Sequence, residues 1–234
     1  MSSIAENIKS IQDSLAKINA SHPADMKDTR LIAVSKTKPV EMLKEAYDAG
    51  MRDFGENKVQ EIIEKYDKLP SDIRWHMIGH LQTNKVKYIA DKVYMIHSVE
   101  SEKLALEISK RAIAAGRVIP VLIEINIGDE ESKFGIKPEE LYDFVKKINT
   151  LEGIKISGLM CVAPYTDDPE NNRAYFKRMR QLSVDIMRKN IDNIGMSVLS
   201  MGMSGDYEVA AMEGSSYVRV GTGIFGERNY NIGM

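Results

Sequence analysis

Short apolar segments alternate with amphipathic segments along almost the whole chain. Residues 31–35, LIAVS, form an apolar, β-branched run of the kind found in a strand that is buried on both faces. Residues 39–50 begin on proline and end on glycine with helical periodicity between them, which is typical of a helix. The other strand candidates are 52–56, 74–79, 93–99, 118–127, 155–162, 197–202 and 216–221. The other helix candidates are 57–69, 83–92, 101–116, 138–151, 172–190 and 204–214.

This alternation limits the fold to an α/β class with a parallel sheet. About eight strand–helix repeats in 234 residues match the length of a single (β/α)8 TIM barrel. A doubly wound open sheet is the alternative, but it normally uses fewer strands. We therefore predict a closed barrel.

An amphipathic helix is expected before the barrel. Ser3 and Glu6 are spaced as a capping box at its start. Its apolar residues recur at helical spacing and are Ile4, Ile8, Ile11, Leu15 and Ile18. No linker or low-complexity tract divides the chain, so we predict one domain, 1–234, with a helix within 1–21 packed on the barrel.

Charge and composition argue against several classes of partner. The formal net charge is −2, so no strong basic field favours nucleic acid or an anionic membrane. No stretch reaches the roughly 20 apolar residues that a membrane helix needs, and the N-terminus lacks the apolar region of a signal peptide. The single cysteine, Cys161, excludes an internal disulfide and fits a reducing compartment. A cytoplasmic protein is expected.

Lys36 follows the first predicted strand directly. In a TIM barrel the active site lies at the C-terminal ends of the strands, and alternation places Ile32, Val34 and Lys36 on one face. If that face is the inner one, the ammonium enters the barrel mouth, where partial burial lowers its pKa and makes it a nucleophile toward carbonyls. The alternative is a lysine that only marks the exit of the strand to water. Lys38 has the same parity and is the nearest competitor.

Two loops near the end of the chain suit an anion. TIM barrels often bind phosphate with the loops that follow the last two strands. Here these loops contain SMGMSGD, with Ser204 at the start of a predicted helix, and GTG, residues Gly221, Thr222 and Gly223. Backbone N–H groups and hydroxyls in both loops could bind the same anion.

Arg219 lies inside the apolar strand segment YVRVG. A guanidinium stays charged at any ordinary pH, so it needs partners in such a strand. One interpretation is an internal salt bridge to a carboxylate of a neighbouring strand. The other is that Arg219 faces a ligand atom that must remain unprotonated.

Metal and nucleophile motifs are weak in comparison. His76 and His80 are four residues apart, but they bracket a strand end and lack the glutamate of H-E-x-x-H, so no metal site is predicted. Cys161 has no evident histidine partner and is interpreted as a small core residue.

Seven segments, in order along nearly the whole chain, carry a family resemblance. They read AVSKTKP, FGENKVQE, WHMIGHLQTNK, ESKFGI, GLMCVAP, LSMGMSGD and VRVGTGIFGER. On these segments the sequence closely resembles the pyridoxal phosphate homeostasis protein family. The resemblance implies a fold-type III barrel, similar to the N-terminal domain of alanine racemases, that binds pyridoxal 5′-phosphate (PLP).

The resemblance also implies roles for individual residues. It implies that Lys36 forms the Schiff base with PLP and that Asn57 lies beside the cofactor. Ser204, Gly221 and Thr222 would hold the phosphate, and Arg219 would face the pyridine nitrogen. The protein is then expected to be a cytosolic monomer that buffers PLP or delivers it to PLP-dependent apo-enzymes, in vitamin B6 homeostasis.

Binding is expected rather than catalysis, for two reasons. Alanine racemases add a second domain that supplies a catalytic tyrosine, and only eight residues follow Gly226 here. A cation opposite the ring nitrogen also disfavours its protonation and weakens the electron sink that carbanion chemistry requires. The alternatives are a PLP-dependent racemase or lyase that uses Lys36 and a tyrosine such as Tyr207, and a Schiff-base aldolase that acts on a sugar phosphate.

Overall fold

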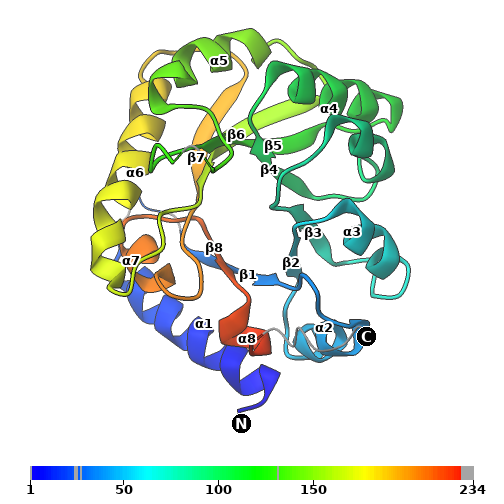
Figure 1. The fold of residues 1–234 in the computed structure, drawn as a ribbon, viewed down its shortest axis with the longest axis vertical. Coiled ribbons are helices and arrows are strands. Elements are labelled where there is room, and N and C mark those ends of the chain that lie inside the picture. The colour runs from blue at the N-terminus through cyan, green and yellow to red at the C-terminus, as the bar shows by residue number, and fades with distance from the viewer. Residues whose placement is uncertain (1, 24–25, 27, 131, 228–234) are drawn as a thin grey trace.

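The computed structural model describes residues 2–23, 26, 28–130 and 132–227. Eight parallel strands close into a barrel in the order β1-β2-β3-β4-β5-β6-β7-β8, which confirms the (β/α)8 fold (Figure 1). The strands are β1 Arg30–Val34, β2 Asp53–Glu56, β3 Arg74–Met77, β4 Met95–Val99, β5 Ile119–Ile125, β6 Ile154–Cys161, β7 Ile194–Ser200 and β8 Tyr217–Val220.

Helices surround the barrel on its outer side (Figure 1). The α-helices are α1 Ile4–Ala20, α2 Val40–Asp48, α3 Val59–Tyr66, α4 Glu102–Ala114, α5 Leu141–Ile148, α6 Arg173–Met187, α7 Tyr207–Met212 and α8 Thr222–Phe225. Three 3₁₀ helices are η1 Thr83–Tyr88, η2 Pro138–Glu140 and η3 Pro169–Asn172. Within the described residues no helix is long and apolar enough to cross a membrane.

The first helix forms as the sequence predicts. Ser3 and Glu6 make the capping box, and the five predicted apolar residues are the ones that α1 buries. This face lies against α7, α2 and α8, so α1 covers the place where the first and last strands pair (Figure 1). The division of the chain into domains stays a prediction.

Two segments differ from the prediction. Within residues 83–92, where an α-helix is expected, Thr83–Tyr88 form the 3₁₀ helix η1 and 89–92 form turns; the buried residues Val86 and Ile89 are three apart, which suits three residues per turn. The GTG segment, expected as a loop, begins the short helix α8, because Ile224 and Phe225 are buried and the Asn7 amide of α1 donates to the Ile224 carbonyl at 2.9 Å.

Apolar side chains fill the space on both sides of the barrel wall. The larger cluster lies between the strands and the helices, and a smaller one fills part of the interior with Ile32, Met95, Leu122, Met160 and Tyr217. Ile32 therefore faces inward, as the alternation in the first strand allows. The interior also holds polar and charged side chains, among them His76, His97 and Arg219. Such side chains are seldom fully buried in proteins.

Gly158 allows β6 and β7 to approach closely. A Cβ atom at this position would lie 1.8 Å from the Val198 carbonyl oxygen, whereas one at Gly195 on β7 would meet nothing closer than 3.7 Å. We expect Gly158→Ala to lower the free energy of unfolding by about 3 kcal/mol or more, because backbone atoms must move. Gly195→Ala is the matched control and should change it by no more than about 1 kcal/mol. Urea unfolding measures both, and equal stabilities would contradict the close approach.

Candidate functional site

Lys36 lies just beyond the C-terminal end of β1 and is half-buried. β1 pairs with β8 on one side and β2 on the other, so Lys36 lies at the rim next to the ends of both strands. The residue that follows, Thr37, has φ +63°, a left-handed conformation that a β-branched side chain rarely adopts. A strained backbone conformation persists only where surrounding contacts hold it. Such residues cluster at active sites and ligand-binding sites.

A buried ionic cluster fixes the backbone on both sides of Lys36. On one side, the Ser35 hydroxyl donates to Glu56 Oε1 at 2.6 Å, and Lys65 Nζ donates to the Ser35 carbonyl at 3.0 Å. On the other, the Thr37 N–H donates to Glu61 Oε2 at 2.6 Å. Lys36 is therefore placed by hydrogen bonds to both of its neighbours.

Lys65 joins the two halves of this cluster. Its ammonium lies 2.7 Å from Glu56 Oε1 and 3.0 Å from Glu61 Oε2, and the side chains of Lys65 and Glu56 are buried. Burial raises the pKa of Glu56, and the charge of Lys65 opposes that rise. This cluster was not predicted from the sequence. The available signal was Lys65 itself, a charged residue on the buried face of α3 with Val59 and Ile62.

Lys38, the competing amine, has a structural role. Its Nζ donates to the carbonyls of Phe225, Gly226 and Glu227 at 3.1, 3.1 and 3.0 Å. These carbonyls follow or end α8, so Lys38 ties the loop after β1 to the end of that helix. These three hydrogen bonds hold the Lys38 amine at the end of α8.

The two glycine-containing loops meet at Ser204. Its Oγ accepts the N–H groups of Gly221 at 3.3 Å and Gly223 at 3.4 Å. A Cβ on Gly221 would lie 3.3 Å from the Val34 carbonyl, so this loop lies against the end of β1, two residues before Lys36. Thr222 lies between the glycines and is exposed. Two N–H groups thus converge on one hydroxyl near the end of the strand that precedes Lys36, and such groups are of the kind that bind an oxyanion.

The start of the preceding helix, α7, holds a carboxylate, and the binding of an anion by its N–H groups stays a prediction. The Asp206 carboxylate lies there, accepts the Met203 N–H at 2.7 Å and accepts the Asn172 amide at 2.8 Å. A negative charge at this point disfavours a second anion. The N–H groups that converge on Ser204 are therefore those of the loop after β8, not those of α7.

Arg219 is buried inside the barrel. It donates to Ser200 Oγ at 2.6 Å and to the Cys161 carbonyl at 2.8 Å. Among the described residues no ion pair to Arg219 is found, so the alternative of an internal salt bridge does not hold. Burial lowers the pKa of Arg219, and the carboxyls of Glu124 and Asp206 act against this at longer range. Cys161 is a buried core residue, and burial raises its pKa to about 12.

Glu124 is a second charged residue inside an apolar strand. On β5 it lies two residues after Leu122 of the inner cluster, and so on the same face of the strand, and its Oε2 is buried without a hydrogen-bond partner among the described residues. Burial and the nearby Glu100 raise its pKa to about 7, and Arg219 opposes the rise. Sequence analysis did not identify it, although a glutamate within VLIEINI is the same kind of signal as Arg219 within YVRVG.

The raised pKa of Glu124 predicts a pH-dependent stability. A pKa that rises from 4.5 to about 7 on folding means that the native state binds the proton more tightly, so stability falls as pH rises through this range. Well above pH 7 the ionised Glu124 carboxylate lowers the free energy of unfolding by about 3 kcal/mol. We expect cofactor-free Glu124→Gln to exceed the wild type in unfolding free energy by that amount at pH 8 and to match it near pH 4. A difference independent of pH would contradict the assignment.

Asn57 follows β2 and packs against the end of β3. A Cβ on Gly79 would lie 2.6 Å from the Asn57 carbonyl oxygen, so the two strand ends are in close contact. Asn57 is half-buried at the same rim as Lys36. Its role beside a cofactor stays a prediction.

The residues present fit a small phosphorylated aldehyde. An amine follows β1, N–H groups that converge on a hydroxyl lie near the end of that strand, and an arginine and a carboxyl oxygen without a hydrogen-bond partner among the described residues are buried in the barrel. A Cβ at Gly223 would press on Val220 at 2.9 Å, so the cradle requires glycine. Within the described residues no group of three or more metal-ligating side chains is found.

Fold and site together define a (β/α)8 barrel of the cofactor-binding class, and comparison with known proteins specifies the class. The sequence matches the family described as "Alanine racemase, N-terminal domain" over residues 2–229. A relative from Aquifex aeolicus, named "Pyridoxal phosphate homeostasis protein", is 46% identical over 86% of this chain and 88% of its own. The chain therefore belongs to the pyridoxal phosphate homeostasis protein family.

Solved structures agree with this assignment. PipY of Synechococcus elongatus PCC7942, solved with PLP bound, has a TM-score of 0.82 and 33% identity and covers 95% of this chain and 100% of its own. An alanine racemase of Clostridium difficile 630 has a TM-score of 0.70 at 18% identity, and the match covers 94% of this chain but 57% of the racemase. That likeness shows the fold alone.

Proposed function

We propose that this protein binds PLP at the mouth of the barrel and serves in intracellular PLP homeostasis. The observation that carries the proposal is the placement of Lys36 next to the convergence of Ser204, Gly221 and Gly223 at one rim. An aldehyde with a phosphate tail matches an amine beside an oxyanion cradle. Family membership, and the PLP bound in PipY, support the same ligand.

Each side chain has a separate task in this proposal. Lys36 binds the aldehyde carbon through its Nζ, and the ionic cluster of Glu56, Lys65 and Glu61 holds the backbone that carries it. Ser204, Gly221 and Thr222 bind the phosphate. Arg219 faces the ring nitrogen, and Asn57 lies beside the ring.

We infer that the protein holds the cofactor and does not turn over amino acids efficiently. Bound PLP supplies an electrophilic aldehyde and an electron-withdrawing ring. A buried cation at the ring nitrogen disfavours protonation of that atom, and this weakens the electron sink. The role is then to buffer PLP or to deliver it to apo-enzymes.

The position of Tyr207 supports holding over two-base catalysis. Its hydroxyl donates to Glu208 Oε1 at 3.2 Å, and the same carboxylate accepts from Ser14 of α1. Its ring packs with the outer hydrophobic cluster, between the barrel and the helices. Tyr207 thus lies toward α1, and a racemase that uses it as the second base is disfavoured.

The test is mass spectrometry of protein purified with PLP and reduced with borohydride. We expect a yellow protein with one pyridoxyl group fixed on the peptide that contains Lys36. Trapping of a lysine only with a sugar phosphate would instead indicate an aldolase. Steady turnover of an amino acid that depends on Lys36 would indicate a racemase or lyase.

A further inference from the structure

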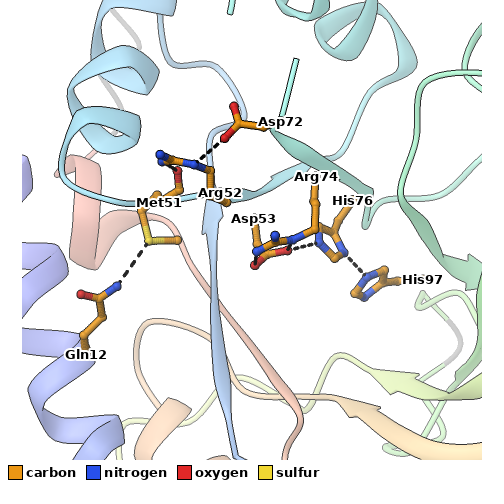
Figure 2. A network of polar contacts seen from close by, with 8 residues as sticks. All are labelled: Gln12, Met51, Arg52, Asp53, Asp72, Arg74, His76 and His97. Carbon is orange, nitrogen blue, oxygen red and sulfur yellow. Dashed lines mark hydrogen bonds and ion pairs between the residues drawn. The ribbon is translucent and has the colours of Figure 1, made fainter. Parts of the chain in front are cut away.

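A continuous chain of buried hydrogen bonds runs through the barrel interior and ends at Arg219. Arg219 Nη1 lies 2.6 Å from Ser200 Oγ, and Ser200 Oγ lies 2.9 Å from His97 Nδ1. His97 Nε2 lies 2.9 Å from His76 Nδ1, and His76 Nε2 lies 2.9 Å from Asp53 Oδ1. The whole chain links side chains of β8, β7, β4, β3 and β2. Figure 2 shows the part of it from His97 through His76 to Asp53.

The far end of the chain is a fixed negative charge. Arg74 donates to both carboxylate oxygens of Asp53, at 2.7 and 2.6 Å (Figure 2). Burial alone would raise the pKa of Asp53, but the hydrogen bonds from Arg74 and His76 hold it at about 2. Asp53 is therefore ionised and accepts hydrogen bonds only.

The two charged ends determine the direction of every bond between them. Because Asp53 can only accept, His76 carries its proton on Nε2, and its Nδ1 must accept from His97 Nε2–H. His97 Nδ1 is then an acceptor, so the Ser200 hydroxyl donates to it and accepts from Arg219. Burial lowers the pKa of both histidines, which keeps them neutral, as this pattern requires.

Polar side chains at these fully buried positions are unusual for a protein core. His76, His97 and Ser200 are fully buried, and a half-satisfied polar network at such positions costs more than an apolar one. Apolar residues of the same volume commonly serve a core equally well. The Tyr217 ring packs against both histidines at 5.3 and 6.1 Å between centroids, so suitable apolar packing is available at the same place.

The chain of hydrogen bonds affects the orientation of the Arg219 guanidinium. Ser200 and the Cys161 carbonyl fix two of its five N–H groups, and both acceptors are neutral. The carboxylate bonded into the chain lies beyond two neutral imidazoles, and Glu124 and Asp206 act on Arg219 only through space. The guanidinium is thus oriented without direct neutralisation by a carboxylate.

We propose that Asp53, His76, His97 and Ser200 are positioning residues that hold Arg219 with its charge directed at the ring nitrogen of PLP, so that this nitrogen stays unprotonated. The inference rests on the proposed function, because it concerns the same site. It assigns a task to buried polar residues of the barrel interior that the proposed function leaves without one.

The first test uses the protein without PLP. Nitrogen-15 NMR of the imidazole rings reports which nitrogen carries the proton, and His22→Gln and His80→Gln variants identify the other two of the four histidines. We expect His76 and His97 to be neutral with the proton on Nε2. A charged ring, or a proton on Nδ1 of either, would overturn the inference.

The second test follows the ring nitrogen of nitrogen-15-labelled PLP during a pH titration. In His97→Leu and in Ser200→Ala, which loses only a hydroxyl, we expect this nitrogen to take up its proton at a pH at least about one unit higher than in the wild type, a tenfold change. Tyr217→Phe, which keeps the packing on both histidines, should match the wild type.

The outcomes separate the inference from the proposed function. An unchanged titration in Ser200→Ala, with PLP still fixed on Lys36, would overturn the inference alone. A wild-type protein on which borohydride fixes no pyridoxyl group would overturn both.

Discussion

Lys36→Ala protein is expected to be colourless after purification with PLP and to carry no pyridoxyl group after borohydride reduction. The loss should be complete, because removal of the amine removes the atom that binds the aldehyde. Lys38→Ala is the matched control, since it lies two residues away with the same parity in the sequence. Its ammonium already donates to three carbonyls near the end of α8.

The control should therefore keep its pyridoxyl group on Lys36 while it loses some stability. Absorbance in the visible range and the mass of the reduced peptide measure both variants. If Lys38→Ala loses the group and Lys36→Ala keeps it, the assignment of the two lysines is reversed.

Lys65→Met is expected to lower the free energy of unfolding at pH 8 by about 3 to 5 kcal/mol, the usual cost of removing one partner of a buried ion pair. The substitution leaves Glu56 and Glu61 without their cation, and the Glu56 side chain is fully buried. Lys44→Met removes a comparable lysine from an exposed pair with Asp48 and should change stability by less than about 1 kcal/mol.

The pH dependence of this loss follows from Glu56. Burial raises its pKa, so as the pH falls from 8 toward 5 the carboxyl takes up a proton and the penalty for its lost partner decreases. The double variant Lys65→Met/Glu56→Gln should recover much of the stability at pH 8. Denaturant unfolding measures all these variants, and a loss that the double variant does not reduce would contradict the ion-pair explanation.

The cluster also connects stability to the site. Ser35 and Thr37 are held by Glu56, Lys65 and Glu61 on either side of Lys36. Lys65→Met should therefore bind less PLP than the wild type even at temperatures where both are folded.

The sequence predicted those parts of the structure that depend on local periodicity. The alternation of apolar strands and amphipathic helices is enough to specify the barrel, and helical spacing identified the buried face of α1. The positions of Lys36 and of the two glycine-containing loops follow from strand order alone, because the ends of parallel strands meet at one rim. Their roles toward a cofactor stay predictions.

Partnerships across strands could not be predicted in the same way. Spacing in the sequence suggested His76 and His80 as the pair to consider, but His76 bonds to His97 of the neighbouring strand. His80 instead stacks on Phe134 and pairs with Glu100. A charged residue in an apolar run shows that a partner is needed, and the register of distant strands determines which residue that partner is.

A crystal structure of the protein with PLP tests the central claim most directly. The account predicts electron density that is continuous from Lys36 Nζ to the cofactor, with the phosphate within hydrogen-bond distance of Ser204 and the Gly221 N–H and the ring nitrogen facing Arg219. Density for PLP at another lysine, or a phosphate bound away from the loops after β7 and β8, would contradict it.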